Sequence, residues 1–173
     1  MPALRGLLPK SAKFPDHERI MAKAMESIPV VTGFFLSPDP PKPGRRDPAP
    51  KASFGMRGTD PVGYLGKFGS AVATLPELEA AAAGNGHVMA IPDPDGIIRR
   101  VPLLLRIEHG TTELVVPSLD VEAIRVAQGA RNIMVKTSDS EVETRGHRTG
   151  ITEIKVGKVQ IPTDAAGQVW LHF

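Results

Sequence analysis

Residues 84–119 read GNGHVMAIPDPDGIIRRVPLLLRIEHGTTELVVPSL, and this stretch decides the fold of the chain. Two runs rich in apolar and β-branched residues flank the turn sequence Pro92-Asp93-Pro94-Asp95-Gly96. In such a turn, proline presets φ, aspartate bonds to its own backbone, and glycine supplies a positive φ. The pattern predicts a β-hairpin whose tip lies at Asp95 and Gly96.

The second half of the stretch predicts more of the sheet and then a helix. The apolar run 103–107 continues beyond Pro102, which has no N–H to donate and therefore favours an edge position or a bulge. After a short turn, residues 113–116 are expected to form a further strand. Ser118 then caps a helix that carries acidic residues in its first turn and Arg125 near its end, as the helix dipole favours.

The chain ahead of this stretch begins with a segment cut by prolines. Residues 1–15 are predicted to be a weakly ordered N-terminal arm. Asp16 can cap a helix that ends near Ser27 and has apolar residues at spacing four, which predicts a core-facing side made of Ile20, Met21, Ala24 and Met25. Residues 28–36 form a continuous apolar run, typical of a strand buried on both faces.

An irregular proline-rich loop follows at residues 37–63. Each proline removes a backbone donor and biases the residue before it toward extended geometry, so residues 38–50 can build neither a helix nor a ladder. Loops of this length are usually functional or disordered, and we favour disorder. The polar residues 138–150 are also expected to be mobile.

A second helix is predicted between this loop and the decisive stretch. Thr74 and Glu77 have the spacing of a capping box, and apolar residues follow at helical spacing until Gly84. We interpret Gly84-Asn85-Gly86 as a helix C-cap with a tight turn. A phosphate-binding glycine loop would need the order strand, glycines, helix, whereas the order here is helix, glycines, strand.

The chain closes with short strands, predicted at residues 133–135, 151–156, 159–161 and 169–173. Alternating strands and helices, together with several hairpins, favour an α/β or α+β fold. We therefore expect a single-domain layered sandwich with a mixed β-sheet and flanking helices. A length of 173 residues suits one such domain.

Composition excludes several classes of protein. The 21 basic and 19 acidic residues leave a formal charge of +2, and a charge so close to balance does not indicate a nucleic-acid-binding protein. The chain has no cysteine, so disulfides, thiol catalysis and cysteine-based zinc sites are excluded. No run approaches the roughly 18 apolar residues of a membrane span, and no signal segment opens the chain. If it belongs to a membrane protein, we expect the spans to lie outside these residues.

Asp95, Arg99 and Arg100 are candidates for binding a ligand or a partner. Successive side chains of a strand point to opposite faces, so one arginine could meet an anion or a partner carboxylate while the other anchors the sheet. The alternative, which carries more weight, is an Asp-Arg pair that only fixes the hairpin in a polar face.

His87 is the one histidine of five that we keep as a binding candidate, although a core or turn histidine is the favoured interpretation. No histidine has a recognised metal-ligand spacing, no serine lies in a nucleophile elbow, and the carboxylates form no acid-base pair. We therefore expect no catalytic residue, no metal and no cofactor. Trp170, Leu171 and Phe173 suit either a buried last strand or the start of a path to a membrane.

The motifs of the chain, taken in order, resemble the CHASE2 domain, the extracytoplasmic sensory module of many bacterial membrane receptors. The resemblance covers residues 16–173 and rests on the serial order of short motifs. These are Leu75-Pro76-Glu77-Leu78, Gly84-Asn85-Gly86-His87, Pro92-Asp93-Pro94-Asp95-Gly96, Arg99-Arg100-Val101-Pro102-Leu103, Pro117-Ser118-Leu119, Ala123-Ile124-Arg125, Val156-Gly157-Lys158, Ile161-Pro162-Thr163-Asp164 and Gly167. Complete members look longer at the N-terminus, so the chain resembles the later part of the module.

The resemblance implies a periplasmic domain of a cell-membrane receptor whose cytoplasmic side carries an adenylate or guanylate cyclase, a histidine kinase or another signalling domain. Its partners would be a small ligand or a periplasmic protein, with a homodimer as a further option. Nucleic acid is not expected, and the membrane would be reached through segments outside this chain. The alternative function is a small-molecule enzyme or solute-binding domain whose site lies in a cleft beneath the loop 38–50.

Overall fold

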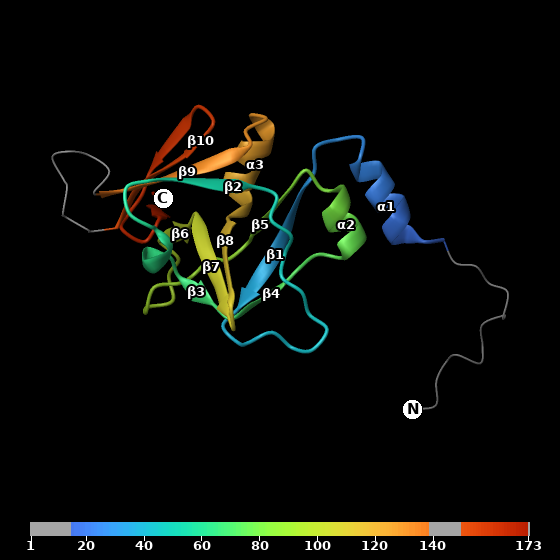
Figure 1. The fold of residues 1–173 in the computed structure, drawn as a ribbon, viewed down its shortest axis with the longest axis horizontal. Coiled ribbons are helices and arrows are strands. Elements are labelled where there is room, and N and C mark those ends of the chain that lie inside the picture. Colours follow the sequence, from blue (N-terminus) through green and yellow to red (C-terminus); the bar gives the residue numbers. More distant parts are fainter. Residues whose placement is uncertain (1–14, 139–149, 173) are drawn as a thin grey trace.

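The computed structural model describes residues 15–138 and 150–172 of the chain (Figure 1). In these residues, three α-helices and twelve strands form a layered α+β fold with mixed sheets, which confirms the predicted fold class. The predictions of a weakly ordered arm at 1–15 and a mobile segment at 138–150 fall almost entirely outside the described residues.

Many of the elements lie close to where the sequence predicts them. The N-terminal helix is capped by Asp16, whose side chain accepts a hydrogen bond from the Arg19 N–H at 3.0 Å. The third helix is capped by Ser118, whose hydroxyl accepts one from the Val121 N–H at 3.3 Å. In chain order the elements are α1 (His17–Met25), β1 (Val31–Ser37), β2 (Ser53–Arg57), the 3-10 helix η2 (Val62–Tyr64), β3 (Lys67–Phe68), β4 (Ser70–Val72), α2 (Pro76–Ala81), β5 (Gly84–His87), β6 (Arg100–Pro102), β7 (Leu104–His109), β8 (Thr112–Pro117), α3 (Leu119–Ala127), β9 (Asn132–Thr137), β10 (Ile151–Val156), β11 (Val159–Pro162) and β12 (Gln168–Trp170).

Two of the sheets join into a nearly closed ring of strands. One sheet has the order β4-β1-β5 and the other β3-β7-β8. Only Gly69 separates β3 from β4, and a parallel bridge between His87 and Ser118 connects the end of β5 to the residue that follows β8. The side chains that these strands turn toward one another form the first core cluster: Phe34, Leu36, Ala71, Leu105, Ile107 and Val116.

The C-terminal half adds a sheet with the order β11-β10-β9-β2. β2 pairs in parallel with β9, and β10 pairs antiparallel with both β9 and β11. Helix α3 contacts β10 on one side and β5 on the other, so it lies between this sheet and the ring (Figure 1). The second core cluster fills this region: Leu65, Leu103, Leu104, Val121, Ile133, Val135, Ile151, Ile154 and Val156.

The glycine sequence ahead of His87 is a buried strand, so its interpretation as a helix C-cap was wrong. Helix α2 ends at Ala81, and all four residues of β5 are buried in parallel pairing with β1. A Cβ atom at Gly86 would lie 2.6 Å from backbone atoms of Ser118 and Leu119. The glycines are therefore needed where α3 begins close against β5, as strand glycines often are where two backbones approach.

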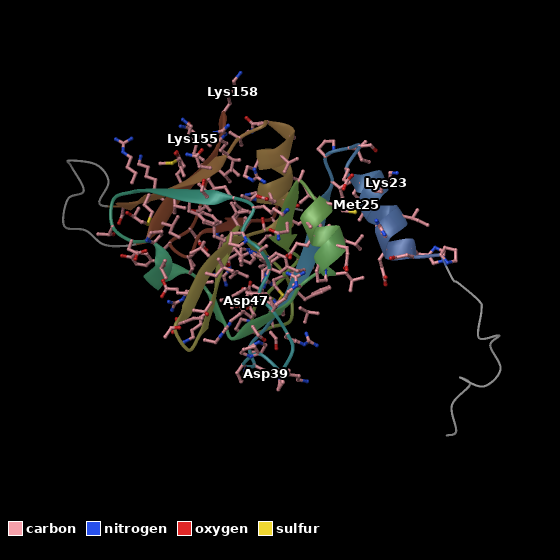
Figure 2. The ribbon with its side chains drawn as sticks, turned by 45° about the vertical axis from the view of Figure 1, so that its right-hand side comes forward. Lys23, Met25, Asp39, Asp47, Lys155 and Lys158 are labelled. Atoms are coloured by element: carbon pink, nitrogen blue, oxygen red, sulfur yellow. The ribbon has the colours of Figure 1, made fainter. Side chains whose placement is uncertain are left out.

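Helix α1 and strand β1 expose more apolar surface than predicted. Met25 is buried on the side of α1 that faces α2, whereas Ile20 is 60% and Met21 is 55% exposed (Figure 2). On β1, Phe34 is buried and Phe35 is 61% exposed. The prediction of burial on both faces of this strand was wrong, because β1 belongs to a ring that encloses the core on one side and meets solvent on the other.

The proline-rich loop is held against the domain, in contrast to the disorder that we favoured. The Ala49 N–H donates a hydrogen bond to Glu79 of α2 at 3.1 Å. Asp47, labelled in Figure 2, is in hydrogen-bond contact with His109, with 3.0 Å between Oδ2 and Nε2. The C-terminal part of the predicted loop also contains a strand, β2, whose Phe54 packs on the second core cluster.

Candidate functional site

The predicted hairpin around Asp95 is a turn without paired flanking strands. The Gly96 N–H donates to the Asp93 carbonyl at 2.8 Å, the Asp93 N–H donates to the Ile97 carbonyl at 3.0 Å, and Gly96 has a φ of 82°. The positive φ at Gly96 confirms the turn chemistry. The strands on its two sides have other partners, because β5 pairs with β1 and β6 pairs with β12. The hairpin prediction was therefore wrong, and residues 88–99 form a loop, here called the turn loop.

Asp93 brings Arg99 of the turn loop and Arg100 of β6 together. Its carboxylate accepts a hydrogen bond from Arg99 Nη1 at 3.2 Å and another from Arg100 Nη2. Arg99 also forms a bidentate pair with Asp95, through contacts of 2.9 and 2.8 Å. The expectation of one free arginine and one anchoring arginine does not describe this geometry. The alternative of Asp-Arg pairs that fix the turn does.

The Asp-Arg pairs lower the pKa values of the two aspartates and raise those of the two arginines. The hydrogen bond from Arg100, followed by that from Arg99, lowers the pKa of Asp93. The hydrogen bond from Arg99 lowers the pKa of Asp95, and the same contacts raise the pKa values of both arginines. The four groups are therefore all charged at neutral pH, and their charges balance.

Trp170 is a member of this site that sequence reasoning assigned only to the last strand or to a membrane path. The Arg100 guanidinium lies over its ring, 5.5 Å from the centroid, in a cation-π contact. The Leu171 N–H donates to the Arg99 carbonyl at 2.8 Å, so the C-terminal strand is tied to the turn loop. Trp170 lies 70 positions from Arg100, and only the pairing of β12 with β6 reveals the contact.

Exposed apolar side chains belong to this site. Trp170 is 56% exposed and Ile97 is 50% exposed, and both flank the arginine pairs. We call this site the Trp170 surface; contacts join Arg99, Arg100, Trp170 and Leu171, and the exposed Ile97 and Ile98 precede Arg99 in the chain. Exposed tryptophan, isoleucine and arginine side chains of this kind are typical of protein contact sites.

His87 is a core histidine, as the favoured interpretation had it. His87 is 1% exposed, its Nδ1 accepts a hydrogen bond from the Met89 N–H at 3.4 Å, and its Nε2 has no hydrogen-bond partner among the described residues. Burial lowers its pKa from 6.5 to about 4, so the ring is neutral at pH 7. Within the part of the chain that the structure describes, no group of three or more histidine, aspartate or glutamate residues could hold a metal ion.

The buried polar cluster around Glu122 was not predicted from the sequence. Glu122 of α3 is fully buried and pairs with Arg125 through two contacts of 2.7 Å, which raises the pKa of Arg125. Glu122 also accepts the Asn85 N–H of β5 at 3.3 Å. The Asn85 side chain donates to buried Glu79 at 3.1 Å, and Glu79 pairs with Arg46 of the proline-rich loop. The i,i+3 spacing of Glu122 and Arg125 was the single local signal of this cluster.

Three hollows of different sizes border the proline-rich loop. Between Pro48, Asn85 and Val116 the free volume is about 10 Å³, which is room for one water molecule. A second hollow of about 290 Å³ lies beside the loop, where Arg45 and Leu75 line it. A third hollow, of about 490 Å³, lies between Pro38 and Pro40 of the loop and Phe68 and His109, so the alternative function stays a prediction.

Comparison with known proteins decides the family. The sequence model of the CHASE2 domain matches residues 7–173. The chain belongs to the CHASE2 family. CHASE2 domains are extracytoplasmic sensory parts of membrane receptors, so the family is sensory and not catalytic. No protein with a curated description and no solved structure matches this chain.

The family match begins nine residues earlier than the resemblance seen in the motifs, at residue 7 instead of 16, so part of the predicted arm lies within the family's range. None of the helices in the described residues is long and apolar enough to cross a membrane.

Proposed function

We propose that this CHASE2 domain is the signal-input domain of a bacterial transmembrane receptor and controls a cytoplasmic adenylate or guanylate cyclase or a histidine kinase. The observation that carries this proposal is the family match over residues 7–173. The layered α+β fold of the described residues is compatible with a sensory role.

The Trp170 surface is the part of the domain that we assign to partner binding. Tryptophan and arginine dominate the binding energy of many protein contacts, and apolar side chains around them exclude water. Both arginines are neutralised by Asp93 and Asp95, so this surface suits a protein partner better than a nucleic acid. The partner is a periplasmic protein or a second copy of the domain.

The signal would pass from the turn loop to the C-terminal strand. The Arg100 stack on Trp170 and the Leu171 N–H bond to Arg99 couple the loop to β12. A partner that favours one of two arrangements of the turn loop would therefore change the position of β12. This coupling needs no chemical step within the domain.

The proposal is tested by removing residues 16–172 from the intact receptor. We expect the cytoplasmic output, measured as cyclic nucleotide or as phosphorylated kinase, to become fixed at one level in every growth medium. The purified cytoplasmic part should retain its enzymatic activity, which controls for damage to the output domain. An output that still varies with the medium as in the wild type would overturn the proposal.

A further inference from the structure

The outer face of the β2-β9-β10-β11 sheet carries a hollow to which the proposed function gives no role. Strand registers place one row of residues side by side across this face: Gly55, Met134, Lys155 and Gln160. The next row on the same face holds Arg57, Lys136 and Glu153. Residues opposite one another in a sheet have Cβ atoms about 5 Å apart, so these side chains form one group.

This group carries an excess of positive charge. It contains the cationic side chains of Arg57, Lys136 and Lys155 and the carboxylate of Glu153, and Lys136 has a further interaction of its own. Arg57 and Lys155 are both exposed, and neither forms an ion pair with another residue in the ranges 15–138 and 150–172. Figure 2 shows Lys155 directed away from the ribbon at this end of the molecule. Two unpaired cations therefore face the same hollow.

The hollow has the size of a small-molecule site and an apolar floor. Its volume is about 280 Å³, near the lower end of the range for ligand pockets. Met134 lies over Gly55, in the space that a side chain at position 55 would fill. A larger residue at position 55 would push the methionine outward and close the hollow.

We propose that this hollow binds a small organic dianion with two carboxylate groups on a short carbon chain. Lys155 stands beside Met134 in the same row, and Arg57 stands diagonally across from it in the next row, so a cation is present on either side of the apolar floor. The two carboxylates meet these cations, Arg57 in bidentate geometry, and the methylene groups cover the Met134 thioether. The two carboxylates of the ligand match Arg57 and Lys155, the two cations of the hollow that form no ion pair among the described residues.

The same dianion would be a stimulus of the receptor. That role rests on the proposed function, whereas binding to the isolated domain does not. The two statements are therefore tested by separate measurements, one on the 173-residue chain and one on the intact receptor.

Binding is measured by isothermal titration calorimetry of the chain with succinate. Arg57→Gln and Lys155→Gln should each weaken succinate binding by about tenfold, because each removes one charge-assisted contact. Lys158→Gln is the matched control, since Lys158 is an exposed lysine in the turn after β10 and does not line the hollow. Its affinity should stay within about twofold of the wild type, and urea unfolding should be unchanged in all three variants.

Several results would overturn the inference: no binding heat at about 10 mM succinate, equal weakening by Lys158→Gln, or binding of inorganic phosphate or phosphatidylglycerol vesicles in place of succinate. Succinate binding without any change in receptor output supports the site and counts against its role in signalling. An output that responds to the medium while succinate fails to bind leaves the proposed function standing and removes this site.

Discussion

Acid should destabilise the domain through His87 at a higher pH than through Asp93, Asp95 or Glu108. Burial holds the pKa of His87 at about 4 in the folded state, against 6.5 for an exposed histidine. The unfolded chain therefore binds a proton more readily than the folded one between these two pH values. The stability due to neutral His87 is fully present above about pH 6.5 and is lost as the pH falls toward 4. At about 1.4 kcal/mol per pKa unit, the loss is about 2 kcal/mol at pH 5 and about 3 kcal/mol in total.

Urea unfolding from pH 8 to pH 4 measures this loss. The variant His87→Phe should show a nearly flat free energy of unfolding between pH 6.5 and pH 4.5, whatever its absolute stability. The control His109→Gln removes a partly exposed histidine that pairs with Asp47 and should keep the slope due to His87. The pKa values of Asp93, Asp95 and Glu108 are lowered, so the stability that these ionised carboxylates contribute is lost at a more acid pH. Equal slopes for wild type and His87→Phe would refute the reasoning.

Three further substitutions test the packing by urea denaturation. Gly86→Ala should lower the free energy of unfolding by more than about 2 kcal/mol, because the new Cβ would meet the backbone at the start of α3. The control is Gly63→Ala, which places a Cβ in open space and should change the free energy of unfolding by less than about 0.5 kcal/mol. Arg125→Met should cost about 3–5 kcal/mol because Glu122 stays buried without its partner, and adding Glu122→Met should recover most of the loss. Gly96→Val should cost about 1–3 kcal/mol because φ is 82° there, and an unchanged midpoint would contradict this conformation.

Most features with local causes could be predicted from the sequence, but the capping box predicted at Thr74 was wrong, because the Thr74 hydroxyl donates to the Gly33 carbonyl at 3.1 Å and Leu75 is the N-cap of α2. The caps at Asp16 and Ser118 and the positive φ at Gly96 each depend on residues within a few positions, and all three are confirmed. Strand pairing depends on distant residues and was missed where it mattered. β5 pairs with β1, which lies some 50 positions earlier in the chain, so a glycine sequence that looks like a turn is a buried strand.

The candidate site was predicted in part for the same reason. Asp95, Arg99 and Arg100 lie within six positions and do form one cluster with Asp93. Trp170 joins them only because β12 pairs with β6. The turn loop could therefore be found from composition and spacing, but the aromatic partner that makes it a contact surface required the tertiary structure.

The most direct test of the central claim is the output of the intact receptor when Trp170 is replaced by alanine. The account predicts that Trp170→Ala changes the stimulus dependence of the cyclase or kinase while the thermal stability of the domain stays close to that of the wild type. Phe35→Ala, which removes an aromatic side chain of similar exposure on β1, should leave the output unchanged. Wild-type output from Trp170→Ala, or an equal change from Phe35→Ala, would contradict the assignment of the Trp170 surface to signalling.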